Sequence, residues 1–166
     1  MERSESTNRR KKIGTVVLAG MLSLNMILPV SAVQASSILD EITETETSED
    51  FSEDTSYSLL RSNNLAYGSA KISKLSSNEI NIYGLTQCHH ECDNVYLYLY
   101  LEQKEDGSYA TYKYWRFELD DATSLSRSIN VIVPSNHYYR VRGYHAAKDG
   151  GTKESTTTLT SGILVK

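Results

Sequence analysis

The sequence predicts an all-β domain, a seven-stranded antiparallel β-sandwich, on the basis of three observations. Beyond residue 60 no segment keeps the 3.6-residue period of an amphipathic helix, and the only proline there is Pro134. Apolar residues alternate with polar residues or tyrosine in short segments that recur about every dozen residues. Turn-forming pairs such as Asp106-Gly107 separate these segments. Seven antiparallel strands in one small domain imply two sheets that pack face to face.

The first three strands are expected at residues 68–75, 79–88 and 94–103. The third reads "NVYLYLYLEQ", and alternation predicts that its aliphatic residues face the core: Val95, Leu97, Leu99 and Leu101. The sequence "KEDGS" that follows predicts a tight hairpin, because Asp and Gly both tolerate positive φ.

The remaining strands are expected at residues 109–119, 125–133, 137–147 and 154–165. In the fourth strand, "YATYKYWRFEL", Trp115 and Phe117 share a face with the apolar phase. We expect these two side chains to be the largest in the core. The sequence "KDGGT" predicts a second tight hairpin between the last two strands.

Residues 1–35 are expected to be a secretory signal peptide. The basic segment "NRRKK" precedes an apolar run over residues 13–30, and "SAVQA" then supplies small residues. This order of basic region, apolar region and small-residue cleavage site is typical of exported proteins. We therefore expect a secreted protein with no stable membrane insertion once the signal is cleaved.

Residues 36–60 are expected to be a disordered acidic spacer. They hold no basic residue and eight acidic ones: Asp40, Glu41, Glu44, Glu46, Glu49, Asp50, Glu53 and Asp54. A segment of low hydrophobicity and one-sided charge does not bury enough apolar surface to offset its ordering entropy. The β-sandwich domain then covers residues 61–166, where acidic and basic residues nearly balance, so no nucleic-acid partner is expected.

The segment "YYRVRGYHAAKDGGTKESTTTLTSGI", residues 138–163, resembles a family of small secreted proteins from Gram-positive bacteria whose function is uncharacterised. The matching features are the tyrosine pair, "RVRG" with a following histidine, "GGTKES" and the final "TSGI". The segment is similar, more loosely, to the last two strands of fibronectin type III domains. That resemblance implies an immunoglobulin-like sandwich with Tyr139 at the tyrosine corner, although Tyr83-Gly84 stands where that family has tryptophan. Neither resemblance implies a catalytic residue or a ligand.

The segment "CHHEC" places Cys88 and Cys92 on either side of two histidines and a glutamate. A local disulfide is the favoured interpretation, because an exported protein can form and keep one. Free thiols and a metal site stay open as alternatives. A structural zinc site needs four ligands, and no second Cys or His pair with metal-binding spacing occurs. No metal and no other cofactor is expected.

The sequence predicts no catalytic site. It has no "GxSxG" motif, and His145 falls on the inward phase of its strand, as a hydrogen-bonded packing histidine does. Asp120-Asp121 is explained by a turn, and no helix follows Gly150-Gly151 to bind phosphate. We therefore expect a protein that is not an enzyme, and keep a small secreted enzyme or metal-binding protein as the last alternative.

Tyrosine and arginine are concentrated on one phase of the third, fourth and sixth strands. If these strands share a sheet, ten side chains gather on its outer face: Tyr96, Tyr98, Tyr100, Tyr112, Tyr114, Arg116, Tyr138, Arg140, Arg142 and Tyr144. These residue types dominate interface hot spots, and they also stabilise sheets simply as cross-strand pairs. The leading hypothesis is a non-enzymatic binding module for a cell-surface glycan or protein. The alternative is a structural protein that uses this face for homo-oligomerisation.

Overall fold

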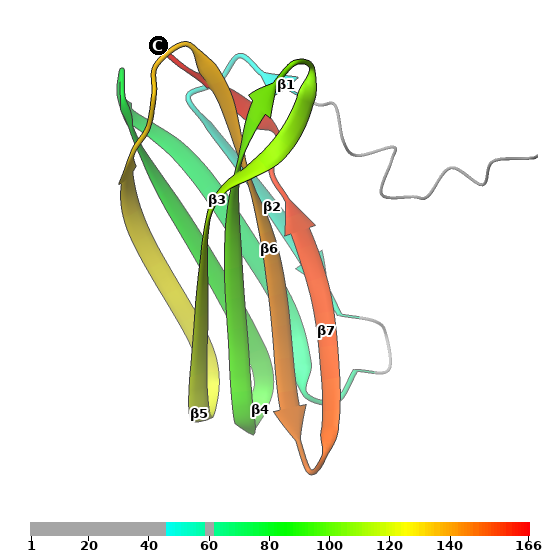
Figure 1. Ribbon diagram of the computed structural model, residues 1–166. Helices are drawn as coiled ribbons and strands as arrows, with labels where there is room; N and C mark the ends of the chain where they lie inside the picture. The colour runs from blue at the N-terminus through cyan, green and yellow to red at the C-terminus, as the bar shows by residue number, and fades with distance from the viewer. Residues whose placement is uncertain (1–45, 59–61) are drawn as a thin grey trace, which may run out of the picture. The chain divides into compact units, whose positions relative to one another are not determined.

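The computed structural model describes residues 46–58 and 62–166, and the regular structure in them is β-strand throughout (Figure 1). The strands are β1 (Glu46–Thr47), β2 (Phe51–Tyr57), β3 (Leu65–Ser76), β4 (Glu79–Glu105), β5 (Ser108–Ile132), β6 (His137–Asp149), β7 (Thr152–Leu159) and β8 (Gly162–Val165). These residues include no helix long and apolar enough to cross a membrane. The all-β prediction is confirmed. The predicted signal peptide lies outside the described residues.

The two longest strands, β4 and β5, form a hairpin that bends midway. Its turn lies at Asp106 and Gly107, which have φ angles of 48° and 86°, as the sequence predicted. The register between the two strands is interrupted between Gln87 and Cys92, where "CHHEC" leads β4 from one wall of the domain to the other. The second and third predicted strands are therefore the two halves of β4, and the fourth and fifth are the two halves of β5.

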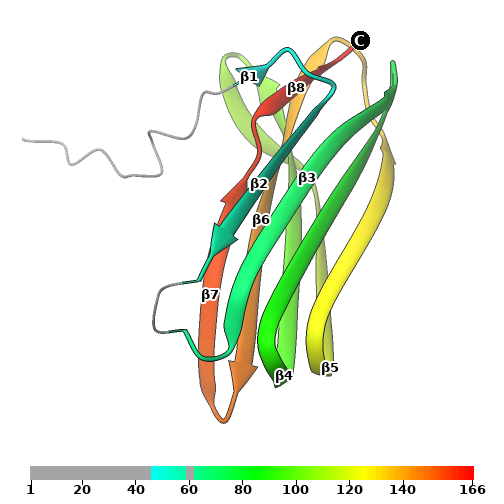
Figure 2. The same cartoon turned by 180° about the vertical axis from the view of Figure 1, so that it is seen from behind.

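All eight strands belong to one sheet that is nearly closed into a barrel (Figures 1 and 2). Its main path runs β1-β8-β6-β4-β3-β2, while β5 pairs with β4 and β7 pairs with β6. The first half of β4 pairs with β3 and the second half with β6, so both walls share this strand. The sequence predicted two separate sheets of an immunoglobulin-like sandwich. The structure has one sheet instead, because β4 and β5 continue through the bend.

Side-chain hydrogen bonds between β2 and β7 close the barrel on one side. Asp54 accepts a hydrogen bond from the backbone N–H of Leu159 at 2.8 Å, and the hydroxyls of Ser56 and Thr156 lie 2.6 Å apart. Figure 2 shows these two strands side by side. The closure therefore uses side chains rather than a backbone ladder.

The carboxylate of Glu154 in β7 holds the segment that leads into β3. It accepts hydrogen bonds from the hydroxyl of Ser62 and from the backbone N–H groups of Asn63, Asn64 and Leu65. Burial raises the pKa of this carboxyl, but the four donors favour the charged form and bring its pKa down to about 2. The ionised carboxylate thus fixes residues 62–65 against β7.

The acidic segment is not a spacer where the structure describes it. β1 pairs in parallel with β8, and β2 forms a seven-residue antiparallel ladder with β3. The prediction of a disordered region is therefore wrong for residues 46–58. Its acidic side chains find partners on distant strands: Glu46 pairs with Lys104, and Asp50 pairs with Lys74. The number of charges in the segment gives no information about these ion pairs, because the partners are far apart in the sequence.

The core is formed by aliphatic side chains at alternate positions of the strands. Four residues confirm the inward phase predicted for the second half of β4, because all are fully buried: Val95, Leu97, Leu99 and Leu101. The expectation for Trp115 and Phe117 is wrong, because both are only partly buried at the margin of the core. They lie on β5, which is the edge of the sheet. Tyr139 and His145 are instead among the largest fully buried side chains.

Tyr139 makes a local hydrogen bond at the start of β6. Its phenol donates to the carbonyl oxygen of Pro134 at 2.9 Å. Burial raises the pKa of this phenol to about 12, so it keeps its proton and stays a donor. This hydrogen bond ties the start of β6 to the turn that precedes it.

Candidate functional site

Seven of the ten side chains predicted for the binding face lie together on the outer face of β4, β5 and β6. Cross-strand pairing forms one row of Arg116, Tyr98 and Tyr144, and a second row of Tyr114, Tyr100 and Arg142. We call these residues, with one further tyrosine of β4, the tyrosine–arginine face: Tyr96, Tyr98, Tyr100, Tyr114, Arg116, Arg142 and Tyr144. The face exists because period-2 alternation on three adjacent strands is in the same phase.

The rings of this face contact one another both across neighbouring strands and along β4. Tyr98 stacks with Tyr144 at a centroid distance of 5.4 Å, and Tyr100 stacks with Tyr114 at 6.2 Å. Tyr96 meets the ring of Tyr98 edge to face at 6.3 Å. Each such aromatic pair stabilises a fold by about 0.5–1.5 kcal/mol beyond the burial of its area. These contacts fix the orientation of the rings before any ligand arrives.

Three basic side chains lie over the rings of this face, and Arg142 and Lys153 are the closest of them. The guanidinium of Arg142 is 4.3 Å from the ring centroid of Tyr100, and the ammonium of Lys153 is 3.9 Å from that of Tyr96. Lys153 also lies 5.8 Å from the ring centroid of Tyr144. The negative face of an aromatic ring attracts a cation placed over it. The rings thereby hold positive charge on the tyrosine–arginine face.

Tyr98, near the middle of the face, is fixed by two neighbours. Its hydroxyl donates a hydrogen bond to Glu118 at 2.8 Å, and the guanidinium of Arg116 lies 5.4 Å from its ring centroid. Burial, followed by the hydrogen bond to Glu118, raises the pKa of Tyr98 to about 12. The phenol is therefore neutral at physiological pH.

One buried carboxylate, Glu102, positions two arginines of β6. It accepts hydrogen bonds from Nε of Arg140 at 2.7 Å and from Nε of Arg142 at 2.8 Å. The exposed fractions of these two arginine side chains are 10% and 41%. The guanidinium of Arg140 lies 4.0 Å from the ring centroid of Tyr109. Arg140 is thus a buried part of the framework, whereas Arg142 reaches the solvent.

The tyrosine–arginine face contains a hollow of about 290 Å³, lined by Tyr98, Tyr100, Arg142, Tyr144, Lys153 and Thr157. This volume is close to the lower limit of small-molecule sites, about 300 Å³. Its lining combines three phenol rings, two cations and one hydroxyl. Such a surface can stack against a flat apolar ring, donate hydrogen bonds and pair with a negative group.

Three residues predicted for the face lie elsewhere, and the first is Tyr112. A β-bulge interrupts the register between the Leu101↔Lys113 and Glu102↔Thr111 pairs. The extra residue is Tyr112, and its ring contacts the buried ring of Tyr139 at a centroid distance of 6.1 Å. Because a bulge adds one residue to one strand, it shifts the alternation of side chains.

The other two displaced residues are Arg140 and Tyr138, which lie toward the start of β6. Arg140 faces outward but is covered, as described above. Tyr138 pairs with Leu164 of β8 and lies against a second hollow. Both residues share the predicted phase of β6, but they lie at the end where β8 and β1 continue the sheet.

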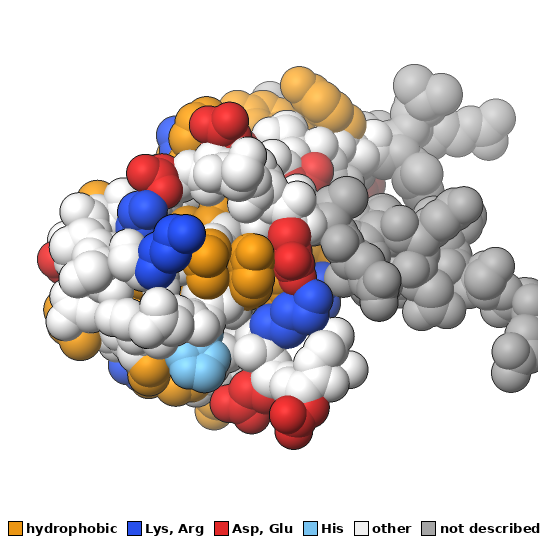
Figure 3. Space-filling model, turned by 90° about the horizontal axis from the view of Figure 1, so that it is seen from above, with side chains coloured by type: hydrophobic (Ala, Val, Ile, Leu, Met, Phe, Trp, Pro, Cys, Tyr) orange, Lys and Arg blue, Asp and Glu red, His pale blue; other side chains and the backbone are white. Residues whose placement is uncertain are grey.

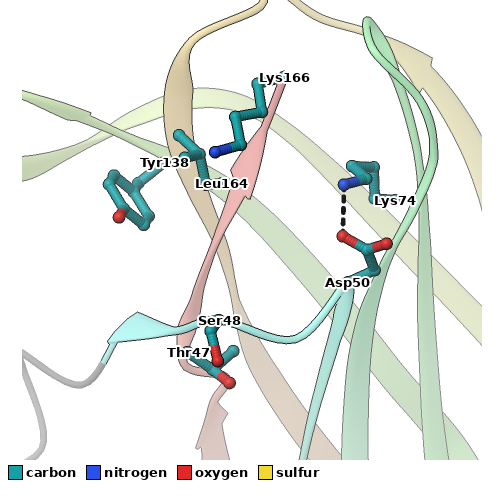
Figure 4. Close-up of a pocket in the computed structure, with 7 residues that line it drawn as sticks. All are labelled: Thr47, Ser48, Asp50, Lys74, Tyr138, Leu164 and Lys166. Atoms are coloured by element: carbon teal, nitrogen blue, oxygen red, sulfur yellow. Dashed lines mark ion pairs between the residues drawn. The ribbon is translucent and has the colours of Figure 1, made fainter.

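The second hollow has a volume of about 250 Å³ and lies at the end of the barrel near the C-terminus (Figures 3 and 4). Figure 4 shows the Lys74–Asp50 ion pair on one side of it and Tyr138 on the other. Figure 3 looks down on this end and shows basic and acidic side chains together around apolar ones. With one aromatic ring and an internal acid–base pair, this hollow is the weaker candidate for ligand binding.

Lys153 and Thr157 of β7 also line the first hollow, and neither is among the residues that the sequence predicted. The sequence signal for these two residues is the Gly-Gly pair in "KDGGT", which predicts the turn before β7. In the structure Gly150 and Gly151 form this turn, with φ angles of 53° and 85°. A two-residue turn fixes the register of the hairpin, which here places Thr157 opposite Tyr144. Counting back from that turn would have added both residues to the face.

Cys88 and Cys92 are free, buried thiols at the bend of β4. The disulfide predicted between them is not formed in the structure. Burial, with the neighbouring thiol, raises the pKa of Cys88 to about 12, and burial also raises that of Cys92. Thiols of this kind are unreactive at neutral pH. Within residues 46–58 and 62–166 no three His, Cys, Asp or Glu side chains gather into a metal-binding group, and His90 pairs with Asp149 at 3.3 Å.

His145 lies in the interior and is a packing residue, as its phase predicted. It is fully buried, and its ring nitrogens lie 3.1 Å from the hydroxyl of Thr86 and 2.9 Å from that of Thr158. Gly68 and Gly143 leave space for the ring, since a Cβ at either position would overlap the imidazole. Burial lowers the pKa of His145 to about 4, so the ring is neutral at physiological pH.

Residues 40–162 match the model of a family of unknown function (DUF6147), and the chain belongs to that family. No curated protein matches the sequence. The chain is similar to a crystal structure described as a Br derivative of BhCBM56, with 14% identity and a TM-score of 0.33, over 66% of this chain and 98% of that one. It is also similar to Spo0M, a sporulation control protein from Bacillus subtilis, with 13% identity and a TM-score of 0.36, over 71% and 51% of the two chains.

Proposed function

We propose that this member of the DUF6147 family is an exported, non-enzymatic module that binds an anionic cell-surface glycan through its tyrosine–arginine face. The observation that carries the proposal is the hollow in which three tyrosines meet Arg142 and Lys153. Export rests on the signal-peptide pattern of residues 1–35.

The phenol rings suit a sugar ring. A sugar is apolar on its C–H faces and polar at its hydroxylated rim, and tyrosine combines a flat apolar face with a hydroxyl at its edge. Tyr98 and Tyr144 are already stacked, and Tyr98 is also hydrogen-bonded to Glu118. Little conformational entropy is therefore lost when a ligand orders these rings. The volume of about 290 Å³ suits one sugar unit of a longer chain rather than a large ligand.

The two cations favour a glycan that carries carboxylate or phosphate groups. Arg142 is 41% exposed and is already oriented by Glu102, and its planar guanidinium matches both anions. Lys153 adds a second positive charge in the same hollow. The nearest carboxylates are engaged, because Glu102 binds two arginines and Glu118 binds Tyr98. Because Glu102 shares one negative charge between two arginines and Lys153 adds another cation, a negative ligand meets a net positive charge.

Affinity electrophoresis of the full chain tests this proposal, in gels that contain polygalacturonate, phosphomannan or neutral dextran. The chain is expected to be retarded in at least one of the anionic gels and not in dextran, and added salt should reduce the retardation. Arg142→Gln and Tyr144→Ala should each weaken the binding at least about tenfold, as interface hot spots do. Tyr57→Ala is the matched control, because Tyr57 is 75% exposed on β2 and lies outside the face.

The same gels show which alternative holds if the proposal fails. A wild-type chain that migrates equally in all three gels contradicts glycan binding and leaves a protein partner as the explanation of the face. Retardation that Arg142→Gln and Tyr144→Ala leave unchanged contradicts the assignment of the site to this hollow.

A further inference from the structure

The strand β5 is an unpaired edge of the sheet. Among the described strands it pairs with β4 alone, and Figure 1 shows it at the margin of the barrel. Of the other edges, β1 is only two residues long, and β2 and β7 are closed against each other by the hydrogen bonds of Ser56 and Asp54. An unpaired edge presents backbone N–H and C=O groups that another strand can bind. The backbone of β5 is therefore open to pairing with another strand, whereas the side where β2 meets β7 is closed.

The edge of β5 is regular over residues 113–120, and Asp121 just beyond it has a φ of 49°. Its register with β4 runs without a shift from the Leu101↔Lys113 pair to the Asn94↔Asp120 pair. The bulge at Tyr112 lies just outside this stretch. Proteins protect an edge with a bulge, a proline or charged side chains. Residues 113–120 have no bulge and no proline, so their charged side chains decide which strand can pair with this edge.

The same stretch leaves apolar side chains incompletely covered. Tyr114 is 60% exposed and Leu119 is 42% exposed. Trp115 and Phe117 are only partly buried and pack against the margin of the core. A strand added to this edge would cover these side chains and extend the core beyond one molecule.

The charges along this stretch are complementary to an antiparallel copy of the same stretch. Arg116 and Lys113 precede Phe117 by one and four residues, and Glu118 and Asp121 follow it by the same intervals. When Phe117 lies opposite Phe117, Arg116 lies opposite Glu118, and Lys113 lies near Asp121, at the end of the regular stretch. Each ion pair occurs twice, once on either side of the two-fold axis.

Neighbouring symmetric registers are unfavourable. An antiparallel pair centred on Arg116 would place two guanidinium groups opposite each other, and a pair centred on Glu118 would do the same with two carboxylates. Like charges directly opposite each other destabilise a strand pair. In the register centred on Phe117, Trp115 also lies opposite Leu119, so the apolar phase is matched as well.

We propose that β5 pairs edge to edge with β5 of a second copy of this chain, antiparallel and with Phe117 opposite Phe117. The two-fold axis of such a pair is perpendicular to the sheet, so side chains of the same phase lie on the same side in both copies. Both tyrosine–arginine faces then lie on one side of a continuous sheet. The proposed dimer does not depend on glycan binding. It would place two of the hollows within reach of one polymeric ligand.

Sedimentation velocity of the full chain over a concentration series tests the proposal through a charge exchange. The wild-type chain is expected to form a dimer. Arg116→Glu sets two carboxylates opposite each other twice, and Glu118→Arg does the same with two guanidiniums, so each should weaken dimerisation at least about tenfold. The double variant Arg116→Glu/Glu118→Arg reverses both charges and should restore the dimer. Lys148→Glu, on β6, makes the same change of charge away from the edge and should leave the dimer unchanged.

Circular dichroism shows which variants are folded, and a cysteine variant tests the register separately. Phe117→Cys places one thiol opposite its own copy and should cross-link under mild oxidation. Ile129→Cys, on the other half of β5, should not. The native thiols contribute little background, because both are buried and the pKa of Cys88 is raised to about 12.

A wild-type chain that is monomeric at every concentration would overturn the proposal, as would a double variant that folds but does not dimerise. Equal cross-linking at positions 117 and 129 would overturn the proposed register. A dimer that Arg116→Glu leaves unchanged would also overturn the proposal, because the contact would then lie elsewhere.

Discussion

Arg140 and Arg142 lie two residues apart on the same face of β6 and bind the same carboxylate, yet their side chains are 10% and 41% exposed. Arg140 is covered by the ring of Tyr109, whose hydroxyl packs so closely on Gly162 of β8 that no Cβ fits there. Arg142 opens into the hollow. The comparison shows that residue type and strand phase do not decide between framework and ligand contact. The elements that lie over each side chain decide it.

The difference between the two arginines can be tested by neutralising each of them in turn. Arg140→Gln is expected to lower the free energy of unfolding by about 3 kcal/mol, because it breaks a buried ion pair. Arg142→Gln should cost under about 1 kcal/mol, since its pair with Glu102 is partly solvated, and should instead weaken glycan binding. Urea unfolding followed by circular dichroism measures both changes. Equal losses of stability would show that the two ends of β6 are not different.

The interior gives a second prediction of similar size. The pKa of His145 is about 4 in the folded protein and near 6.5 in the unfolded chain, so the unfolded chain binds the extra proton as the pH falls. Its contribution to stability is complete above pH 6.5 and decreases as the pH falls from 6.5 to 4, by about 3 kcal/mol in total. The pKa of Glu154 is lowered from 4.5 to about 2, so the stability that this carboxylate contributes is lost only below about pH 4.5.

The free energy of unfolding measured between pH 7 and pH 4.5 therefore tests the contribution of His145 separately from that of Glu154. The wild-type chain should lose stability over this range, and His145→Gln, which keeps hydrogen-bonding capacity but does not titrate there, should not lose it. A slope that is equal in both proteins would assign the pH dependence to other groups.

The alternation in residues 95–101 predicted the outward face of β4 because the period of two is a local property of a strand. Tyr112 was misplaced because a bulge depends on the register between two strands. Trp115 was taken for a core residue because its place on the edge strand depends on the whole sheet order. The acidic strands were missed for the same kind of reason, since Asp54 meets its partner on β7, about a hundred residues away. What depends on distant pairing did not follow from local pattern.

The proposed binding of glycan by the tyrosine–arginine face can be tested with a matched pair of tyrosine variants. Tyr98 and Tyr112 both lie in the predicted set, but only Tyr98 lines the hollow, whereas the ring of Tyr112 contacts Tyr139. The measurement is the affinity of Tyr98→Ala and Tyr112→Ala for the anionic polysaccharide that retards the wild-type chain. The account predicts at least about a tenfold loss for Tyr98→Ala and no more than about twofold for Tyr112→Ala. Equal losses, or a loss for Tyr112→Ala alone, would contradict it.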